Sequence, residues 1–564
     1  MTFDLRHQVF SSLSRYQRAY LRPDLVAGVT VWAVMVPEAL AYASIAGVPA
    51  VVGLYAAVPA LLLYAAFGSS RHLIVGPMSA TAALSAAIVA DFAGGQPDHF
   101  IAITAALALV TGMIGILAGL ARLGFVAAFI SEPVLKGFIV GLALTIIVGQ
   151  IPALFGIDKG EGNFFEKTWS IVEHLGDTHW RTAAIGFVSL ALVLVLRRWL
   201  PLVPGALVVV LGSVLAVSLL DLDRRGVDIV GAIDPGLPEL GLPDGLSGAD
   251  YLDLVGPAVG VLLIGFAEGL GAAKTYAAKS GYTVDANREL TGLGAANLGS
   301  GLCAGMVVNG SLSKTAVNGG AGAKTQLSGL TVAVLTLVTL LFLTGLFEKL
   351  PEATLAAVVI AAVIDLVDIP ALVNLYRVYT ARLGRIYGHA TRIDFLAAVA
   401  AMVGVLVFDT LPGLVIGVAV SLLLLLYRVS RPHVASLVKQ NTRWVDRANH
   451  PDLDAIAGVL VVRVEAGLFF ANADHVRDHI TSLLTPETTR VVLDAETSSF
   501  IDVSAVRMLL ELHHTLRSRH VGLRIARDAA QFGDVMAAVD PDRRIGLYPS
   551  VTAAIDQPDR RDDH

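Results

Sequence analysis

The sequence predicts a polytopic α-helical membrane protein that ends in a water-soluble α/β domain, and three observations lead to this fold class. Of the 564 residues, 55% are hydrophobic and only 16% are charged, whereas a soluble globular protein carries about 25% charged residues. Apolar runs of about 20 residues, long enough to span the core of a bilayer, follow one another as far as Tyr427. From Arg443 onward the sequence is rich in Arg, Asp, Glu and His.

The composition also argues against other classes of protein. No basic block suggests nucleic acid binding, and the single cysteine, Cys303, excludes an intramolecular disulfide. The sequence offers no nucleophile–base pair and no metal-ligating cluster, so we expect no enzyme, no metal and no cofactor.

Fourteen membrane-spanning segments are expected, with boundaries good to a few residues. They are 24–48, 50–67, 77–92, 98–121, 131–151, 182–199, 203–220, 252–273, 288–304, 312–322, 325–346, 352–369, 390–409 and 411–428. The third and tenth are conspicuously short. An even number of spans returns the C-terminal domain to the side of the N-terminus.

The chain is expected in the inner (plasma) membrane, and the distribution of basic residues predicts that both termini lie in the cytoplasm. Most Lys and Arg residues fall in the expected cytoplasmic connections, as the positive-inside rule requires, whereas the expected outside loop 221–253 is acidic. The exceptions are Lys159, Lys167, Arg181, Arg224, Arg225 and Lys349. Residues 1–22, in which Arg alternates with aromatic residues and leucine, predict an interfacial helix on the cytoplasmic side.

The fourteen spans divide into two halves of seven, about 24–220 and 252–429. An odd number of spans per half means that the second half is inserted upside down relative to the first. The two short spans occupy corresponding places and open with "GPMSATAAL" (76–84) and "NGSLSKTAV" (309–317). Paired interruptions in inverted repeats are typical of the substrate site of a secondary transporter, near the middle of the membrane.

The two interrupted spans predict a site for an anion. Each break is followed by a helix start that carries hydroxyl residues, Ser79 and Thr81 in one half and Ser311 and Ser313 in the other. A helix start offers unpaired N–H groups and the positive end of a dipole, and Lys314 can add a full positive charge. The alternative is a pair of kinked spans whose Ser and Thr side chains bond back to their own helix. The symmetric placement favours the anion site.

Two carboxylates inside spans are candidates for proton coupling, because an ionisable group at mid-depth is costly and is usually functional. Glu38 follows Pro37 in the first span, and Glu268 lies among small residues in the eighth. An acid shielded from water binds a proton more readily than an exposed one. A buried structural hydrogen bond is an equally good interpretation of each acid taken singly.

The sequence resembles the sulfate permease family of anion transporters, whose members end in a cytoplasmic STAS domain. The resemblance covers nearly the whole chain and is most specific in "DLVAGVTVWAVMVPEALAYASIAGVPAVVGLYAA" (24–57), "FGSSRHLIVGPMSATAAL" (67–84) and "NGSLSKTAVNGGAGAKTQLSGL" (309–330). It implies a core domain and a gate domain, elevator-like alternating access, a homodimer and a small inorganic or organic anion as substrate, of the sulfate, bicarbonate or dicarboxylate class. It places the substrate site at Ser79, Ala80 and Thr81 on one side and at Ser311, Leu312 and Ser313 on the other.

Two residues depart from the family's usual pattern. Many relatives have Gln in place of Glu38, and relatives often have Arg in place of Lys314. A carboxylate at position 38 weakens anion binding unless it is protonated, which favours proton-coupled symport. Sodium coupling and anion exchange stay open as alternatives. Lys314 keeps the charge of an arginine but lacks its planar fork, so it constrains an oxyanion less.

The soluble end predicts an α/β domain, because strand and helix patterns alternate along it. We expect strands at 459–465, 468–471, 489–496 and 522–526, with helices at 472–484, 502–520 and 529–539. The expected divisions are a linker at 430–450, the domain at 451–557 and a disordered tail at 558–564. The domain resembles STAS domains, and "FIDVSAVRML" (500–509) resembles the segment that is phosphorylated in bacterial relatives. Asp502 and Ser504 are therefore candidates for regulation, although a helix N-cap explains them more simply.

Three other functions remain to be weighed against a carrier. A membrane sensor would bind an anion and signal through the C-terminal domain, and a channel would conduct anions without coupling. A nucleobase–cation symporter shares the inverted-repeat logic, but the C-terminal domain and "NGSLSKTAV" argue against it.

Overall fold

The computed structural model describes residues 9–557 apart from 15, 94–96, 126–131, 161, 201–203, 232–235, 378–392, 409 and 528–529. The chain divides into two compact units, Met1–Asn374 with Asp394–Ser421, and Leu375–Ile393 with Leu422–His564. Each is described by itself. Residues 1–8 of the expected interfacial segment and the expected tail 558–564 lie outside the described residues.

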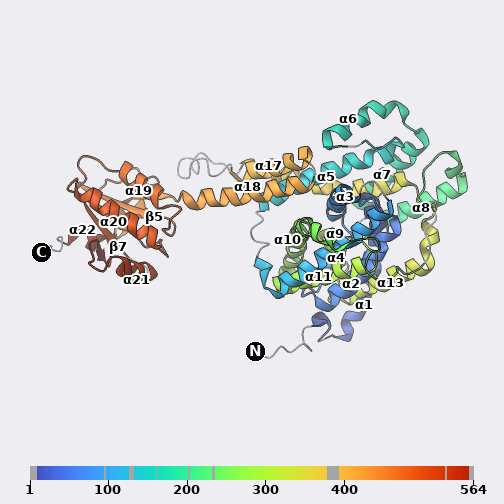
Figure 1. The fold of residues 1–564 in the computed structure, drawn as a ribbon, viewed down its shortest axis with the longest axis horizontal. Coiled ribbons are helices and arrows are strands. Elements are labelled where there is room, and N and C mark those ends of the chain that lie inside the picture. Colours follow the sequence, from blue (N-terminus) through green and yellow to red (C-terminus); the bar gives the residue numbers. More distant parts are fainter. Residues whose placement is uncertain are drawn as a thin grey trace. The chain divides into compact units, whose positions relative to one another are not determined.

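The first unit is helical, and a helix lies at each of the fourteen expected spans (Figure 1). These helices are α1 (Leu21–Ile45), α2 (Ala50–Phe67), α3 (Ser79–Ala93), α4 (Pro97–Leu120), α5 (Glu132–Phe155), α7 (Trp180–Trp199), α8 (Gly205–Leu220), α10 (Val255–Ser280), α11 (Ala286–Leu302), α12 (Leu312–Gly320), α13 (Leu327–Val338), α14 (Glu352–Val363), α17 (Ile393–Phe408) and α18 (Thr410–Ser430). Helix α18 crosses into the second unit.

Length and composition alone would have found only part of this set. Among the described residues, seven helices are long and apolar enough to cross a membrane, and five others are apolar but shorter. Helix α12 has only 9 residues, as the short tenth span predicts. Helix α13 continues through a π turn at Thr339–Leu343 and a 3-10 turn at Thr344–Phe347. Among the described residues this unit also holds the α-helices α6 (Phe164–His174), α9 (Gly248–Asp253) and α15 (Ile369–Arg377), the last reaching the boundary between the units.

The expected N-terminal helix is not formed in the described part of 1–22. Residues Ser11–Leu13 and Arg18–Tyr20 make two short 3-10 turns, and α1 begins only at Leu21. The turns are held by the ends of other helices, since Phe10 N donates to Ala66 O at 2.8 Å and Arg288 Nη2 donates to Ser11 Oγ at 3.1 Å. These tertiary contacts override the amphipathic pattern.

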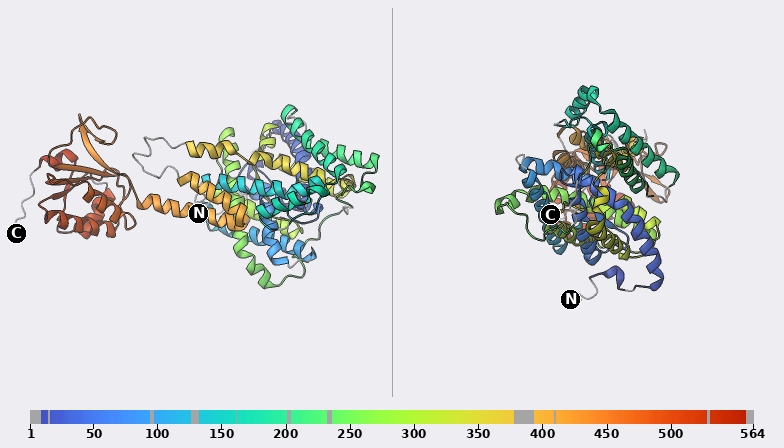
Figure 2. Two further views of the ribbon diagram at one scale, coloured as in Figure 1. Left: turned by 90° about the horizontal axis from the view of Figure 1, so that it is seen from above. Right: turned by 90° about the vertical axis from the view of Figure 1, so that its right-hand side faces the viewer.

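Small residues let two helices of the first unit touch along their backbones. A Cβ atom added to Gly112 of α4 would lie 2.3 Å from Leu298 N of α11, and one added to Gly294 of α11 would lie 2.5 Å from Ile116 N of α4. Such close approach is the way helices associate where lipid removes the hydrophobic drive. Figure 2 shows the helices of this unit packed into one bundle from two further directions.

Two short buried strands mark the inverted repeat. Strand β1 (Ile74–Gly76) pairs antiparallel with β2 (Asn309–Ser311), with Val75 opposite Gly310. Each strand leads into one of the two short helices, α3 or α12. The two repeats therefore meet at this crossing, as the paired interruptions in the sequence predict.

The second unit holds a six-stranded sheet in the order β4-β3-β5-β6-β7-β8. Its strands are β3 (Val434–Gln440), β4 (Arg443–Asp446), β5 (Val459–Val464), β6 (Arg490–Asp494), β7 (Gly522–Ala526) and β8 (Gly546–Tyr548). Strands β5 to β8 are parallel, and β3 is antiparallel to β4 and β5. Helices α19 (Ala473–Ser482), α20 (Val503–Arg517) and α21 (Ala530–Val539) pack on one face and α22 (Val551–Asp556) on the other.

Two expectations for this unit are wrong. The segment 430–450 is no linker, because β3 and β4 lie within it and extend the sheet. In β3 the residues Val434, Leu437 and Val438 are buried, and their burial stabilises the strand in spite of the basic residues around it. The expected strand at 468–471 is reduced to a single bridge between Leu468 and Ile501. Strand β8 and helix α22 were not expected.

Candidate anion site

The β1–β2 crossing fixes the starts of α3 and α12 next to each other. Ser311 is the N-cap of α12, and its Oγ accepts a hydrogen bond from Lys314 N at 3.2 Å. The Ser311 and Ser313 hydroxyls lie 3.1 Å apart. Across the crossing, Ile74 N donates to Thr315 Oγ1 at 3.1 Å. The two predicted halves of the site are therefore held together by backbone and side-chain bonds.

The predicted residues differ in their access to solvent. Ser79, Ala80 and Thr81 at the start of α3 are buried, and so is Ser311. Leu312 is 55% exposed and Ser313 is also exposed. Thr81 Oγ1 donates to Met78 O at 3.3 Å, the local bond that a kinked span would show. The α12 side of the site is thus the accessible one in this conformation.

Lys314 is the residue that joins the two half-helices. Its side chain is 1% exposed, and its Nζ atom donates to Pro77 O, just before α3, at 3.0 Å. The same Nζ forms an ion pair with Glu38 Oε2 of α1 at 3.0 Å and lies 5.0 Å from the centre of the Tyr42 ring. A buried charge is tolerated only when it is paired in this way. The ammonium group is therefore held by one carboxylate, one carbonyl and one aromatic face.

Glu38 and Lys314 were each singled out by the sequence, and the structure brings them into contact. Pro37, beside Glu38, lies inside α1 and lacks the N–H that would bond to the Ala33 carbonyl. Helix α1 nevertheless runs unbroken from Leu21 to Ile45. The proline is accommodated within the helix and does not end it.

Glu268 of α10 lies beside β2 and forms no ion pair with Lys314. Asn309 Nδ2 of β2 donates to Glu268 Oε2 at 3.3 Å. Gly265 and Gly269, on either side of Glu268 in α10, lie against Asn309 and Gly310 and let the helix approach the strand. Among the described residues Glu268 forms no ion pair. Glu38 and Glu268 each lie on the first helix of their repeat, and among the described residues Glu38 is paired with a cation and Glu268 is not.

Sequence reasoning missed a set of amide side chains that hold the crossing in place. Asn297 Nδ2 donates a hydrogen bond to Val308 O, and Asn297 Oδ1 accepts one from Val308 N, each at 2.9 Å. Gln326 Nε2 donates to Ser70 O and Leu73 O at 2.9 Å. Polar amides in otherwise apolar or small-residue spans were the available signal, because a buried amide needs partners.

Two further buried carboxylates, Asp24 and Glu289, brace the approaches to the site. Glu289 accepts from Tyr64 Oη at 2.6 Å and from Ser69 N at 2.7 Å, in the turn before β1. Asp24 accepts from Lys324 N at 2.6 Å and from Thr325 Oγ1 at 2.6 Å, before α13. Neither residue was singled out from the sequence, since both lie at the ends of predicted spans.

In the second unit the two predicted regulatory residues have different surroundings. Asp502 is the N-cap of α20, accepting from Ala505 N at 2.8 Å, and its other oxygen accepts from Phe470 N at 2.9 Å. Ser504 is exposed in the first turn of the helix. The N-cap interpretation therefore holds for Asp502, while the side chain of Ser504 is exposed.

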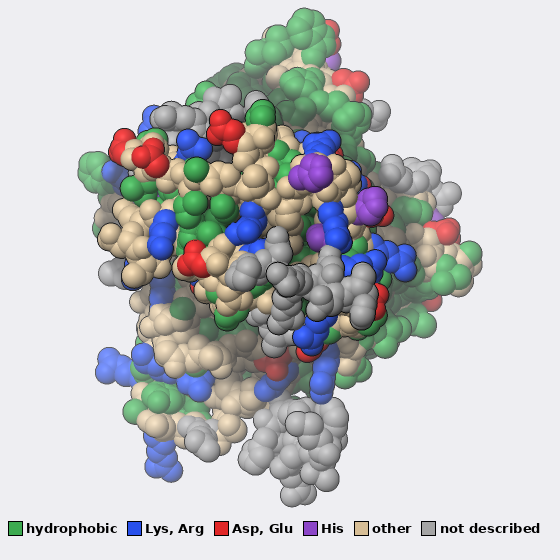
Figure 3. All heavy atoms as spheres, turned by 90° about the vertical axis from the view of Figure 1, so that its left-hand side faces the viewer, with side chains coloured by type: hydrophobic (Ala, Val, Ile, Leu, Met, Phe, Trp, Pro, Cys, Tyr) green, Lys and Arg blue, Asp and Glu red, His purple; other side chains and the backbone are tan. Residues whose placement is uncertain are grey.

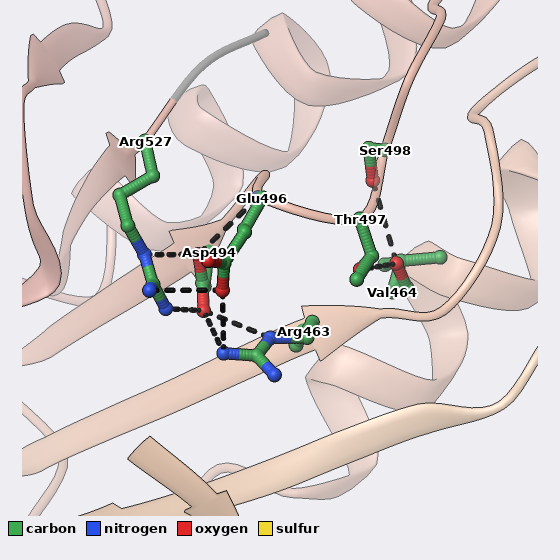
Figure 4. Close-up of polar contacts among 7 residues, drawn as sticks. All are labelled: Arg463, Val464, Asp494, Glu496, Thr497, Ser498 and Arg527. Atoms are coloured by element: carbon green, nitrogen blue, oxygen red, sulfur yellow. Dashed lines mark hydrogen bonds and ion pairs between the residues drawn. The ribbon is translucent and has the colours of Figure 1, made fainter. Parts of the chain in front are cut away.

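Close to that segment, the fully buried Asp494 at the end of β6 lies between two arginines (Figure 4). Arg463 donates to its Oδ2 atom from Nε at 2.9 Å and from Nη2 at 2.6 Å. Arg527 donates from Nε to Oδ1 at 3.0 Å and from Nη2 to Oδ2. Glu496 completes the group, 3.2 Å from Arg463 and 2.8 Å from Arg527. Two cations and two carboxylates thus form a closed network.

Comparison with known proteins places both units. The sequence profile of the sulfate permease family matches residues 21–384, and that of the STAS domain matches residues 450–554. A probable sulfate transporter of Mycobacterium tuberculosis (strain CDC 1551 / Oshkosh) is 36% identical over 536 residues, which cover 94% of this chain and 93% of the relative. High affinity sulfate transporter 2 of Stylosanthes hamata is 30% identical over 541 residues, covering 91% and 79%.

Solved structures share the fold. The murine solute carrier 26 family member A9 anion transporter, in the inward-facing state, superposes with a TM-score of 0.87 at 23% identity, covering 98% of this chain and 94% of that one. The transmembrane domain of a cyanobacterium bicarbonate transporter gives a TM-score of 0.61 at 24% identity, covering 71% and 98%. With its two inverted repeats, its paired half-helices and its C-terminal STAS domain, the chain belongs to the sulfate permease family of anion transporters.

Proposed function

We propose that this transporter is a proton-coupled symporter of a sulfate-class anion, working by elevator-like alternating access. The substrate class is supported by the relatives, which are named as sulfate transporters. The coupling is supported by one observation above all, the ion pair between Lys314 and Glu38 at the meeting point of the two half-helices.

The pair couples the two solutes through charge. While Glu38 is ionised, it neutralises Lys314, and an anion arriving at α12 meets little net positive charge. When Glu38 takes up a proton, Lys314 keeps its charge and loses its carboxylate partner. The site then attracts an anion, so proton and anion bind together. The reverse sequence on the other side of the membrane releases both.

The anion itself would be held by the starts of the two half-helices. The first N–H groups of a helix have no acceptor within it, and the helix dipole adds about half a positive charge at that end. On one side these groups belong to Ser79, Ala80 and Thr81, and on the other to Ser311, Leu312 and Ser313. The exposure of Leu312 and Ser313 supports entry from the α12 side.

Glu268 is the second candidate for the proton site, favoured by a specific observation. Its Oε2 atom accepts a hydrogen bond at 3.3 Å from Asn309 Nδ2, at the start of the strand that precedes α12. Among the described residues it has no cationic partner. Proton uptake there would change the charge beside β2 without touching Lys314. Coupling to sodium, anion exchange, and sensing through the STAS domain are the other outcomes to be separated.

The test is uptake of radiolabelled sulfate into proteoliposomes with an imposed pH gradient. Wild type is compared with Glu38→Gln, Glu268→Gln and the control Glu132→Gln, whose carboxylate is exposed and only pairs with Lys136 at the surface. We expect an inward proton gradient to accelerate uptake by wild type and Glu132→Gln, and to have no effect on Glu38→Gln.

Each other outcome has a distinct meaning. If Glu38→Gln keeps its response to the gradient and Glu268→Gln loses it, Glu268 is the proton site. Uptake that ignores the pH gradient in wild type contradicts proton coupling, and a requirement for sodium would replace it. Binding without uptake points to a sensor, and current without coupling to a channel. Bicarbonate and dicarboxylates as competitors define the anion class, and cross-linking in membranes tests the expected homodimer.

A further inference from the structure

A basic cavity lies in the STAS domain at the C-terminal end of α20, whereas Asp502 and Ser504 lie at its N-terminal end. It has a volume of about 420 Å³, within the range of small-molecule sites. It is formed where α20 ends and where β7 and β8 begin. Its basic lining residues are His513, Arg517, His520, Arg524, Arg543 and Arg544. No Asp or Glu is among the described residues that line it.

The basic residues of this cavity differ in their partners. Arg544 pairs with the buried Asp540 at 2.8 Å. Arg524 is 2% exposed, and its Nη1 donates to the carbonyls of Ala554 and Gln557 at 2.6 and 2.7 Å. Among the described residues, the side chains of Arg543 and His520 make no hydrogen bond or ion pair. Figure 3 shows basic and histidine side chains, together with some acidic ones, on the face of the second unit that is turned toward the viewer.

The backbone adds an independent observation. His520 has φ of 61° and Arg543 has φ of 51°, both in the left-handed region where glycine is the usual residue. A side chain is disfavoured there, because its Cβ atom lies too close to the following carbonyl oxygen. Two basic residues with an unfavourable backbone conformation thus lie on the two turns that border the same cavity. Strain of this kind is typical of binding sites.

We propose that this cavity binds a small anion that carries two or more phosphate or sulfate groups. Arginine forks match the oxygen atoms of such groups, and several arginines close together are stabilised by a multiply charged ligand. The volume exceeds what a single tetrahedral anion fills. The site is separate from the transport site and gives the cytoplasmic domain a ligand of its own.

The test uses the full-length protein in phosphatidylcholine nanodiscs, with hydrogen exchange followed by mass spectrometry. The probe is pyrophosphate, compared with orthophosphate, sulfate and chloride at equal ionic strength. At about ten times its Kd, pyrophosphate should slow exchange in 517–524 and 543–548 about tenfold, because opening must then displace the ligand. Chloride should have no such effect.

The variant Arg543→Gln should abolish the protection, and the matched control Arg519→Gln should retain it. Arg519 is an exposed arginine on the same turn as His520 but does not line the cavity. Arg543 is preferred to Arg517 because Arg517 also balances the C-terminal dipole of α20. Protection that survives in Arg543→Gln, or that chloride reproduces, overturns the proposal. So does protection that appears without pyrophosphate when anionic lipid is added to the nanodisc, since the occupant is then a lipid headgroup.

Discussion

The two buried charge clusters of this protein are built differently. In the membrane unit, one ammonium group, that of Lys314, meets one carboxylate, that of Glu38, through a single contact of 3.0 Å. In the STAS domain, Asp494 is fully buried and receives four hydrogen bonds from two guanidinium groups, with Glu496 bridging both. In the first cluster one carboxylate atom, Glu38 Oε2, pairs with the ammonium group. The second is satisfied on every side and serves to hold the ends of β5, β6 and β7 together.

The largest expected effect follows from replacing Lys314, the cation of the first cluster. We expect Lys314→Met to abolish sulfate uptake and to lower the free energy of unfolding by about 3–5 kcal/mol, because Glu38 is left buried without its partner. Lys314→Arg should retain part of the uptake. The double variant Lys314→Met/Glu38→Gln separates the two effects, since it should regain stability but not transport. Normal uptake by Lys314→Met would remove this residue from the mechanism.

A comparable loss of stability is expected in the second cluster, but without a direct effect on the anion site. Asp494→Asn leaves Arg463 and Arg527 facing a neutral amide, and we expect the STAS domain to lose about 3–5 kcal/mol. Hydrogen exchange of 490–494 and 522–526 in the full-length protein measures the loss. The exchange of β1 and β2 should not change. Unaltered exchange in β6 would mean that the network contributes little to the domain.

A smaller effect is expected at the start of α20, where the two candidate regulatory residues form a matched pair. Asp502→Ala removes the N-cap and the bond to Phe470, and should cost about 1 kcal/mol. Ser504→Ala should stay within about 0.5 kcal/mol of wild type, as for other exposed sites. Thermal denaturation of the two variants measures the difference. Equal effects would contradict the assignment of Asp502 as the cap.

The smallest expected effect concerns pH. Burial, followed by the neighbouring His475 and His433, lowers the pKa of His479 from its usual 6.5. The folded state therefore holds this proton less tightly than the unfolded state, and stability is lost as pH falls through and below about 6.5. The change in Tm between about pH 7.5 and about pH 5.5 should be smaller in His479→Gln than in wild type. A larger change in the variant would reverse the sign of this contribution.

The sequence predicted the elements of the fold better than their contacts. The fourteen spans and the two short helices follow from hydrophobic runs and from the breaks at Gly76-Pro77 and Asn309-Gly310, which are local features. The contact of Lys314 with Glu38 joins residues that are 276 positions apart (314 − 38) in the sequence. No local sequence pattern encodes such a contact. Glu38 looked like an isolated negative charge beside the anion, and the structure gives it a cation of its own.

The misread segments have a physical explanation as well. In 430–450 the basic residues Arg431, Lys439, Arg443 and Arg447 are exposed, and their number concealed the buried Val434, Leu437 and Val438. The side-chain contacts of Tyr42 and Asn309 were not predicted, because a tyrosine or an asparagine beside small residues has no chemical signature until its partner is known. Their roles depend on Lys314 and Glu268, which lie on other elements.

The backbone contact between α4 and α11 has a mechanical consequence. Where Gly112 faces Leu298 and Gly294 faces Ile116, there is no layer of side chains that could slide or tilt. Asn297 of α11 in turn forms two hydrogen bonds with the backbone of Val308, just before β2. Whatever displacement carries the anion across the membrane, α4, α11 and the start of α12 must travel as one stiff block, and the hinges have to lie elsewhere.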